Sequence, residues 1–393
     1  MKQTQERKFY ITLDEILLVL IIAAALGYFV FAPMRNATTR HIFVLFGTVG
    51  CYLIAARQIA VRYLEARKLA VIGGIGLIMF FSVLFYRGDE WFDLLYACAG
   101  FLTLVILFVA DTRPAMSERI EKMFFAAALA IAALLTAAYF GGNAYVFEDG
   151  KMTGALVLGM TNPNLTAMFI SGSYCILLIR FRKNKKQFLV VPVLLWLLYM
   201  LYLTESRSSL ICTLLVTAYA MVLYNRKLPQ FLVVVSTLTP VAFVPIYLAG
   251  VHSRLAKLTI LGKPFFSGRE ELYMRRFSIL ETPLQKLFGD LGSEQFSNAH
   301  NAPLSILCSI GAVGLCLFLY GCTVRLLTLN RNASSAESRI AVACLLSVFI
   351  QSSAEALMLV GNFPAMFFLY AYLLMAQSGR ADAPKPELQG GAV

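Results

Sequence analysis

One histidine stands out among the residues that could do chemistry. His300 is followed by Asn301 in SNAHNAPLSILCSIGAVG, where a polar stretch gives way to a long apolar run. An imidazole at such a membrane–water boundary can exchange protons with solvent and still face a lipid-borne substrate. A polar residue that starts a helix would leave the same pattern, so spacing alone keeps both interpretations open.

Arginines are the candidate anion-binding residues. Arg207 lies in LTESRSSLI between two apolar runs, and Glu205 is its candidate ion-pair partner. A charge at membrane depth costs a few kcal/mol unless it is paired or hydrated. The alternative is a guanidinium at a cavity mouth, where its forked N–H donors suit phosphate oxygens. Arg269 and Arg276 fall on one side of an expected helix, although isolated loop arginines are usually solvated.

Two further features indicate a cavity within apolar sequence. Asn162-Pro163-Asn164 breaks or opens a span, and unwound backbone at membrane depth is tolerated where it lines a cavity or is buried in protein. Glu355 stands in the apolar stretch SSAEALML. It is either the partner of a buried arginine or part of the site itself.

Common active-site motifs are absent from the sequence. It has no GxGxxG, Walker A, HExxH or GxSxG pattern, which removes support for nucleotide-driven transport, zinc hydrolysis and the usual serine hydrolases. Its eight cysteines have no CxxC or metal-ligand spacing. We expect them to be small buried hydrophobic residues.

Composition places these residues in a membrane. Apolar residues make up 59% of the chain and charged residues 14%, whereas about 25% of the residues in soluble proteins are charged. Apolar runs of spanning length recur along the chain, so we expect an all-α polytopic membrane protein of about 12 transmembrane helices. The expected spans are 13–32, 41–56, 69–86, 92–110, 122–140, 160–180, 187–204, 208–224, 230–249, 303–324, 340–359 and 362–377.

The distribution of charge orients these spans. The net charge is +12, but Lys and Arg lie in short clusters between apolar runs, so we do not expect nucleic-acid binding. Most of the clusters fall at the N-terminus and on the loops that share its side of the membrane. Both termini are therefore predicted to be cytoplasmic.

One long segment, 250–302, is predicted to lie on the outer side. Apolar residues recur in it at helical spacing from Tyr273 to Leu287, which predicts an amphipathic helix that Pro283 ends or kinks. A helix that only lies on the bilayer surface is the alternative. We expect a single membrane domain, residues 1–377, followed by a disordered cytoplasmic tail, residues 378–393.

Together, these motifs resemble those of the O-antigen ligase and O-antigen polymerase family. SGREELY, ETPLQKLFGDLG and AHNAPLSILCSIGAVG follow one another as in that family's outer-loop signature. His300 and Asn301, followed after nine residues by Gly311 and then by Gly314, match the ligases' histidine motif. TNPN at 161–164 and SRSSL at 206–210 are similar to the family's upstream motifs, in the same order.

The resemblance implies a C-type glycosyltransferase-like fold and a metal-independent enzyme of the bacterial inner membrane that needs no cofactor. The donor would be an undecaprenyl-diphosphate-linked glycan, the acceptor a glycan or glycolipid hydroxyl on the outer face, and the partner proteins a flippase or a chain-length regulator. The catalytic residues would be His300, Arg207 and Arg269. The residues expected to bind substrate are Asn301, Arg276, Asn162, Asn164 and Tyr273.

Several reactions and one other class of protein remain open from sequence. The compact outer loop favours a repeat-unit polymerase for O-antigen, capsule or exopolysaccharide. The alternative is an O-antigen ligase that joins the glycan to a lipid A-core or another surface acceptor. Trp91, Tyr145 and Tyr273 offer sugar-stacking surfaces in either case. A transporter of lipid-linked glycans or small solutes would be expected to show paired broken helices, and only 162–164 breaks a span.

Labelling with a membrane-impermeant maleimide tests the orientation. Gln295→Cys should react from outside spheroplasts and Asn184→Cys should not, because only position 295 lies in the expected outer segment. The wild-type chain, with its eight cysteines, controls for background labelling. Reversed labelling would put the outer segment on the cytoplasmic side, away from an externally presented donor.

Overall fold

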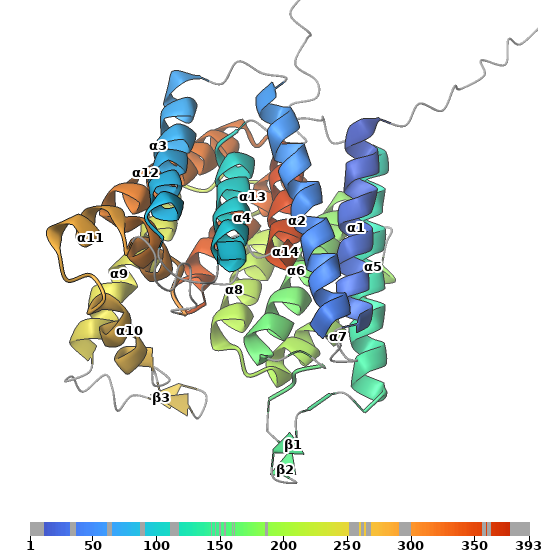
Figure 1. Ribbon diagram of the computed structural model, residues 1–393. Helices are drawn as coiled ribbons and strands as arrows, with labels where there is room; N and C mark the ends of the chain where they lie inside the picture. The colour runs from blue at the N-terminus through green and yellow to red at the C-terminus, as the bar shows by residue number, and fades with distance from the viewer. Residues whose placement is uncertain are drawn as a thin grey trace, which may run out of the picture.

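The computed structural model describes residues 12–31, 37–60, 65–86, 91–110, 118–142, 144–145, 147–148, 151–152, 155–158, 160, 162–184, 188–250, 259–260, 263–264, 269–290, 300–355, 359 and 363–377. These residues form helices and two short antiparallel hairpins, β1 (Phe147–Glu148) with β2 (Lys151–Met152) and β3 (Thr259–Ile260) with β4 (Lys263–Pro264) (Figure 1). The helices are α1 (Leu13–Phe31), α2 (Ala37–Ala60), α3 (Ala66–Leu84), α4 (Trp91–Val109), α5 (Glu118–Phe140), α6 (Pro163–Lys183), α7 (Val190–Leu203), α8 (Arg207–Ala218), α9 (Gln230–Gly250), α10 (Arg269–Phe277), α11 (Pro283–Phe288), α12 (Ala302–Asn332), α13 (Ala336–Gln351) and α14 (Phe363–Gln377), with a π-helical turn, Tyr219–Leu223, after α8.

The all-α prediction is confirmed, and a helix lies at each of the expected span positions. Among the described residues, five helices are long and apolar enough to cross a membrane, namely α1, α3, α5, α6 and α12. Large apolar side chains on α2, α3 and α9 are also exposed; the exposed fraction is 65% for Phe46, 61% for Phe80 and 65% for Phe231. Exposed apolar surface on this scale indicates contact with lipid, so the chain is a helical membrane protein.

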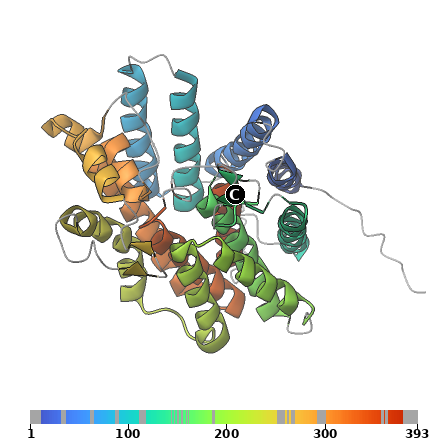
Figure 2. The ribbon, with the colours of Figure 1, turned by 90° about the horizontal axis from the view of Figure 1, so that it is seen from below.

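The core is built around α6. Every residue from Leu165 to Ile179 is buried, as expected for a helix that is apolar on all sides. α5, α7, α8 and α13 pack against α6, whereas α3, α4 and α12 form a neighbouring group (Figures 1 and 2). α10 and α11 lie at one end of the molecule, against α9 and α12.

Several helix boundaries differ from the predicted ones, and two of these differences bear on the candidate site. The span expected at 340–359 ends as a helix at Gln351, and a turn follows that leads to Glu355. The amphipathic stretch is two helices, because α10 ends at Phe277 and Pro283 begins α11 at a position where a missing N–H costs nothing. Thr282 caps α11 with a reciprocal bond to Gln285. The expected tail, 378–393, lies outside the described residues.

Glycines allow α11 to touch a kink in α12. Gly311 has a φ of +69° inside α12, and Gly289 ends α11 with a φ of +87°. A Cβ on Gly311 would lie 2.2 Å from the backbone of Leu287, and one on Gly289 would lie 2.4 Å from the backbone of Ser309. Because the two backbones meet here and φ is positive, only glycine fits at either position. The contact fixes α11 against α12, the helix that His300 precedes.

Ion pairs tie the helices together at the opposite end. Glu121 on α5 pairs with Arg180 and with Lys183 on α6, and Lys183 also lies 3.6 Å from Glu337 at the start of α13. Arg180 and Glu121 are 11% and 10% exposed, so their charges are shielded from water and depend on each other.

Candidate functional site

The turn that follows α13 gathers groups from distant parts of the chain. The Ser352 carbonyl accepts a hydrogen bond from the backbone N–H of Ala302, at 3.0 Å. The Ser353 carbonyl accepts from the Tyr273 hydroxyl at 3.3 Å and from the Asn301 side-chain amide at 3.2 Å. The Ala354 carbonyl accepts from the guanidinium of Arg269. The turn therefore holds the start of α10 and the start of α12 at one place.

Glu355, the next residue, is the centre of this site. Its side chain is 3% exposed. Its carboxylate lies 2.7 Å from Nη2 of Arg269 and 3.1 Å from Nδ1 of His300. The Asn164 side-chain amide donates to the same carboxylate. The structure thus joins three predicted site residues through a fourth that sequence analysis placed either with a buried arginine or in the site.

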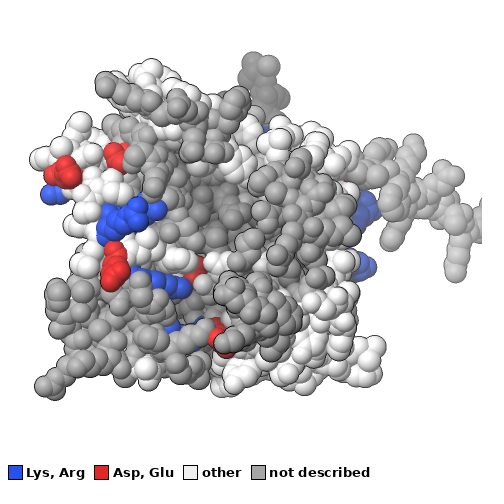
Figure 3. Space-filling model, turned by 60° about the horizontal axis from the view of Figure 1, so that its bottom comes forward, with Lys and Arg blue, Asp and Glu red and all other residues white. Residues whose placement is uncertain are grey.

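The Glu355 carboxylate needs these partners because of where it is buried. An isolated carboxylate taken out of water costs several kcal/mol. Arg269 supplies the compensating charge and Asn164 a further donor, and both come from segments far from Glu355 in the chain. With Arg269 18% exposed and His300 27% exposed, the cluster is open on one side. In the view with the bottom of the molecule turned forward, Lys, Arg, Asp and Glu side chains lie close to one another on the left (Figure 3).

The Asn-Pro-Asn motif begins α6 and is not a break within it. Asn162 is the N-cap, and its side chain accepts from the backbone N–H of Asn164 at 2.8 Å. Pro163 occupies the first position, where its fixed φ suits a helix start. This local chemistry sets the direction of the Asn164 side chain, which reaches Glu355. The motif therefore contributes one donor to the site and one cap to the core helix.

His300 is held in an uncommon backbone conformation. Its φ is +52°, in the left-handed region that few residues other than glycine adopt. Asn301 secures it from one side by capping α12, with its side chain accepting from Leu304 N–H at 2.9 Å. The Tyr273 hydroxyl donates to the His300 carbonyl at 3.2 Å. A neutral imidazole that donates Nδ1–H to Glu355 carries its lone pair on Nε2.

Arg207 is the first residue of α8, on the neighbouring helix. Glu205, with a φ of +56°, turns the chain there from α7 into α8. Two residues after Arg207, the hydroxyl of Ser209 accepts from the Gln351 side chain at the end of α13. This buried bond ties the start of α8 to the helix end that leads into the Glu355 turn. Arg207 itself is partly exposed.

Two predicted substrate-binding residues have their contacts within the protein. Tyr273 is fully buried, and its hydroxyl bonds to the carbonyls of His300 and Ser353. Asn301 is also fully buried, and its amide donates to the carbonyls of Pro240 and Ser353. In this structure neither side chain offers surface to a sugar. Both position the His300 segment instead.

The contacts described for the other predicted residues are with residues outside the Glu355 cluster. Arg276 is half-buried on the last turn of α10, where its carbonyl accepts from Cys308 Sγ at 3.4 Å. Trp91 is 41% exposed at the start of α4, with its ring against Tyr86, and Tyr145 is half-buried. The turn 352–354 was not predicted from the sequence. It contributes backbone carbonyls, and every residue type has one, so no pattern of residue types indicates them.

Comparisons with known proteins assign no family to the chain. No protein-family model matches it. No curated protein matches it in sequence. The likeness described above therefore rests on the motif residues, three of which the structure brings to one carboxylate.

Removal of the Glu355 carboxylate tests the cluster. Glu355→Ala should lower the free energy of unfolding by about 2 to 3 kcal/mol, because it leaves a partly buried guanidinium without its counter-charge. Glu281→Ala, an exposed carboxylate between α10 and α11, is the control and should change it by less than about 0.5 kcal/mol. Denaturant unfolding in detergent measures both. If the two losses are equal, Glu355 does not hold the cluster together.

Proposed function

We propose that this protein is a metal-independent glycosyltransferase that joins lipid-linked glycans at the outer face of the bacterial inner membrane. One observation carries the proposal: the Glu355 carboxylate gathers Arg269, His300 and Asn164 at one end of a membrane helix bundle. The motifs that resemble those of O-antigen ligases and polymerases supply Arg269, His300 and Asn164, together with Arg207. A C-type glycosyltransferase-like arrangement of about 12 spans, with both termini cytoplasmic, belongs to the same proposal.

The arginines suit the charge change of this reaction. When a sugar leaves an undecaprenyl diphosphate, the bond between its anomeric carbon and the phosphate oxygen breaks, and the electron pair stays on the diphosphate. Preorganised cations aimed at that developing charge lower the barrier. Arg269 has five N–H donors, of which Glu355 and the carbonyl of Ala354 engage two. Arg207, at the start of α8, supplies a second guanidinium on the neighbouring helix.

His300 suits the other half of the reaction. The acceptor hydroxyl attacks the anomeric carbon from the face opposite the diphosphate, a new C–O bond forms, and the hydroxyl proton goes to Nε2 of His300. The Glu355 carboxylate, 3.1 Å from Nδ1, fixes the ring tautomer and stabilises the imidazolium that results. This carboxylate–histidine pair follows the logic by which an acidic residue orients a general base.

Arginine variants test the role in leaving-group stabilisation. Arg207→Ala and Arg269→Ala should each reduce turnover by about 100-fold or more, as removal of one oxyanion donor does elsewhere. Arg→Lys should recover only part of the loss, because the forked geometry is gone. Arg275→Ala, an exposed arginine on the same helix as Arg269, is the matched control. Turnover by purified, folded Arg269→Ala at the wild-type rate would remove Arg269 from the mechanism.

His300 variants separate a general base from an orienting group. His300→Ala should lower turnover by about 100-fold if Nε2 accepts the proton. Glu355→Gln should slow turnover while changing acceptor KM little, because it acts through His300. A His300→Gln variant that keeps most of its activity would show that His300 orients the acceptor and does not take its proton.

The polymerase assignment is tested with donor alone. Purified protein given an undecaprenyl-diphosphate-linked repeat unit should release free undecaprenyl diphosphate and build a ladder of longer lipid-linked chains. In the described part of the outer segment, the regular elements are two short helices and a hairpin of two strands with two residues each. So small a segment favours an acceptor of small cross-section, such as a lipid-linked repeat unit. Product that forms only after a lipid A-core is added would identify a ligase. No release of the diphosphate with any acceptor would leave the transporter hypothesis.

A further inference from the structure

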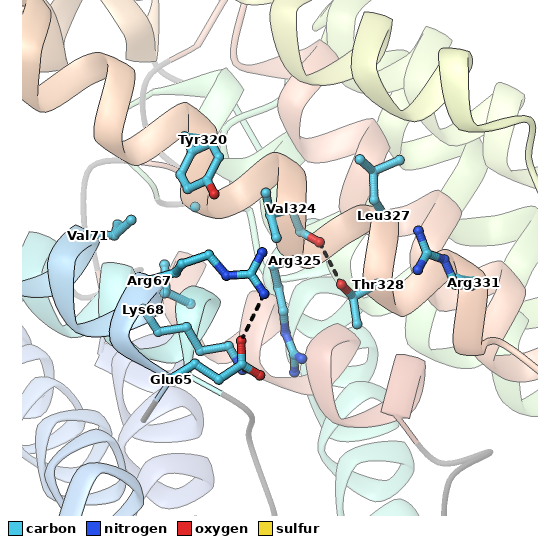
Figure 4. Close-up of a pocket in the computed structure, with 12 residues that line it drawn as sticks. Glu65, Arg67, Lys68, Val71, Tyr320, Val324, Arg325, Leu327, Thr328 and Arg331 are labelled. Atoms are coloured by element: carbon cyan, nitrogen blue, oxygen red, sulfur yellow. Dashed lines mark hydrogen bonds and ion pairs between the residues drawn. The ribbon is translucent and has the colours of Figure 1, made fainter. Parts of the chain in front are cut away.

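A basic cavity lies at the other end of α12 from Glu355. Its volume is 410 Å³, and it is lined by the start of α3, the end of α4 and the last turns of α12 (Figure 4). The candidate site forms where α6 and α12 begin and α13 ends, so the two sites occupy opposite ends of the bundle. Along α12 they are separated by on the order of 30 Å. The cavity therefore plays no direct part in the chemistry proposed for His300.

The ionised groups that line the cavity are mostly positive. Arg67 and Lys68 come from the first turn of α3, and Arg325 and Arg331 come from α12. Glu65 is the acidic residue among the lining residues, 3.7 Å from Arg67 and 3.5 Å from Lys68. Figure 4 shows the side chains of Arg67, Lys68 and Arg325 directed into the space between the two helices. Four cations against one carboxylate make the cavity a site for an anion.

The backbone adds to this field. α3 is 19 residues long, and its N-cap, Glu65, makes no side-chain cap hydrogen bond. The start of α3 lines the cavity, and the helix dipole favours negative charge at a helix start. The Glu65 carboxylate there is 59% exposed. A phosphate that entered would compete with it for Arg67 and Lys68.

Apolar and aromatic side chains that line the cavity, or lie beside it, are exposed on the surface of the helices. Tyr320 and Val324 line the cavity and are 49% and 39% exposed. Leu69, beside Lys68, is 52% exposed. Both α3 and α12 are long and apolar enough to span a membrane. An anion that enters from this side would be attached to hydrocarbon, since lipid covers such surfaces.

We propose that this cavity binds the phosphate headgroup of an anionic phospholipid, with the acyl chains lying along α3 and α12. Basic pockets between membrane helices are the usual form of such sites. Arg67, Lys68 and the buried Arg325, which is 4% exposed, hold the phosphate, and Tyr320 and Val324 flank the chains. The bound lipid links the start of α3 to the C-terminal part of α12. The inference is independent of glycan transfer.

Native mass spectrometry of the purified full chain in detergent tests the proposal. The wild type should retain one phosphatidylglycerol at least tenfold more tightly than a phosphatidylcholine with the same acyl chains. The Arg67→Gln/Lys68→Gln double variant should lose about 30-fold in affinity for phosphatidylglycerol, because each charge near a membrane surface contributes about 1 kcal/mol. Glu65→Gln should bind it more tightly, because a competing carboxylate is gone.

Matched variants decide whether the cavity itself is responsible. Arg119→Gln/Lys122→Gln removes two charges from the start of α5, where both side chains are largely exposed, and should leave affinity unchanged. Thr328→Phe fills the cavity without a change of charge and should abolish the selective retention. Equal losses in the two double variants would overturn the proposal in favour of a general surface field. Displacement of the lipid by millimolar inorganic phosphate would overturn it in favour of a free phosphate ligand.

Discussion

The arrangement of the candidate site depends on one buried carboxylate. Glu355 follows a helix in an apolar chain, and a charge in that position is stable only with a counter-charge and hydrogen-bond donors. Arg269, His300 and Asn164 meet this requirement from three other segments. The same requirement that stabilises the fold therefore also brings the candidate catalytic groups within contact distance of one another.

Backbone geometry makes that meeting possible. The carbonyls of the turn 352–354 are taken up by Ala302, Tyr273, Asn301 and Arg269, so the turn is defined by its partners more than by its own residues. The close contact of α11 with the kink in α12 holds the outer segment against the bundle. A positive φ at His300 is tolerated because bonds on both sides of the residue fix it.

α12 joins two regions with different physical chemistry. At its start, the preceding His300 faces the Glu355 carboxylate, and at its far end Arg325 and Arg331 line a basic cavity. The first region has nearly balanced charge and suits a reaction in which charge moves from a hydroxyl to a diphosphate. The second has excess positive charge and suits static anion binding. Because both regions lie on α12, this helix with its kink at Gly311 fixes their positions relative to each other.

The sequence by itself determined what depends on neighbouring residues. Apolar runs located the helices, because a run of that length can satisfy its backbone in lipid only as a helix, and the Asn-Pro and Thr-Pro starts follow from local capping chemistry. The motifs also singled out His300, Arg269 and Asn164, but only the tertiary structure decided that they meet at Glu355. It likewise decided that α13 ends at Gln351 and that Tyr273 is buried. Those outcomes depend on hydrogen bonds between residues up to 191 positions apart, and no local pattern encodes a partner at that distance.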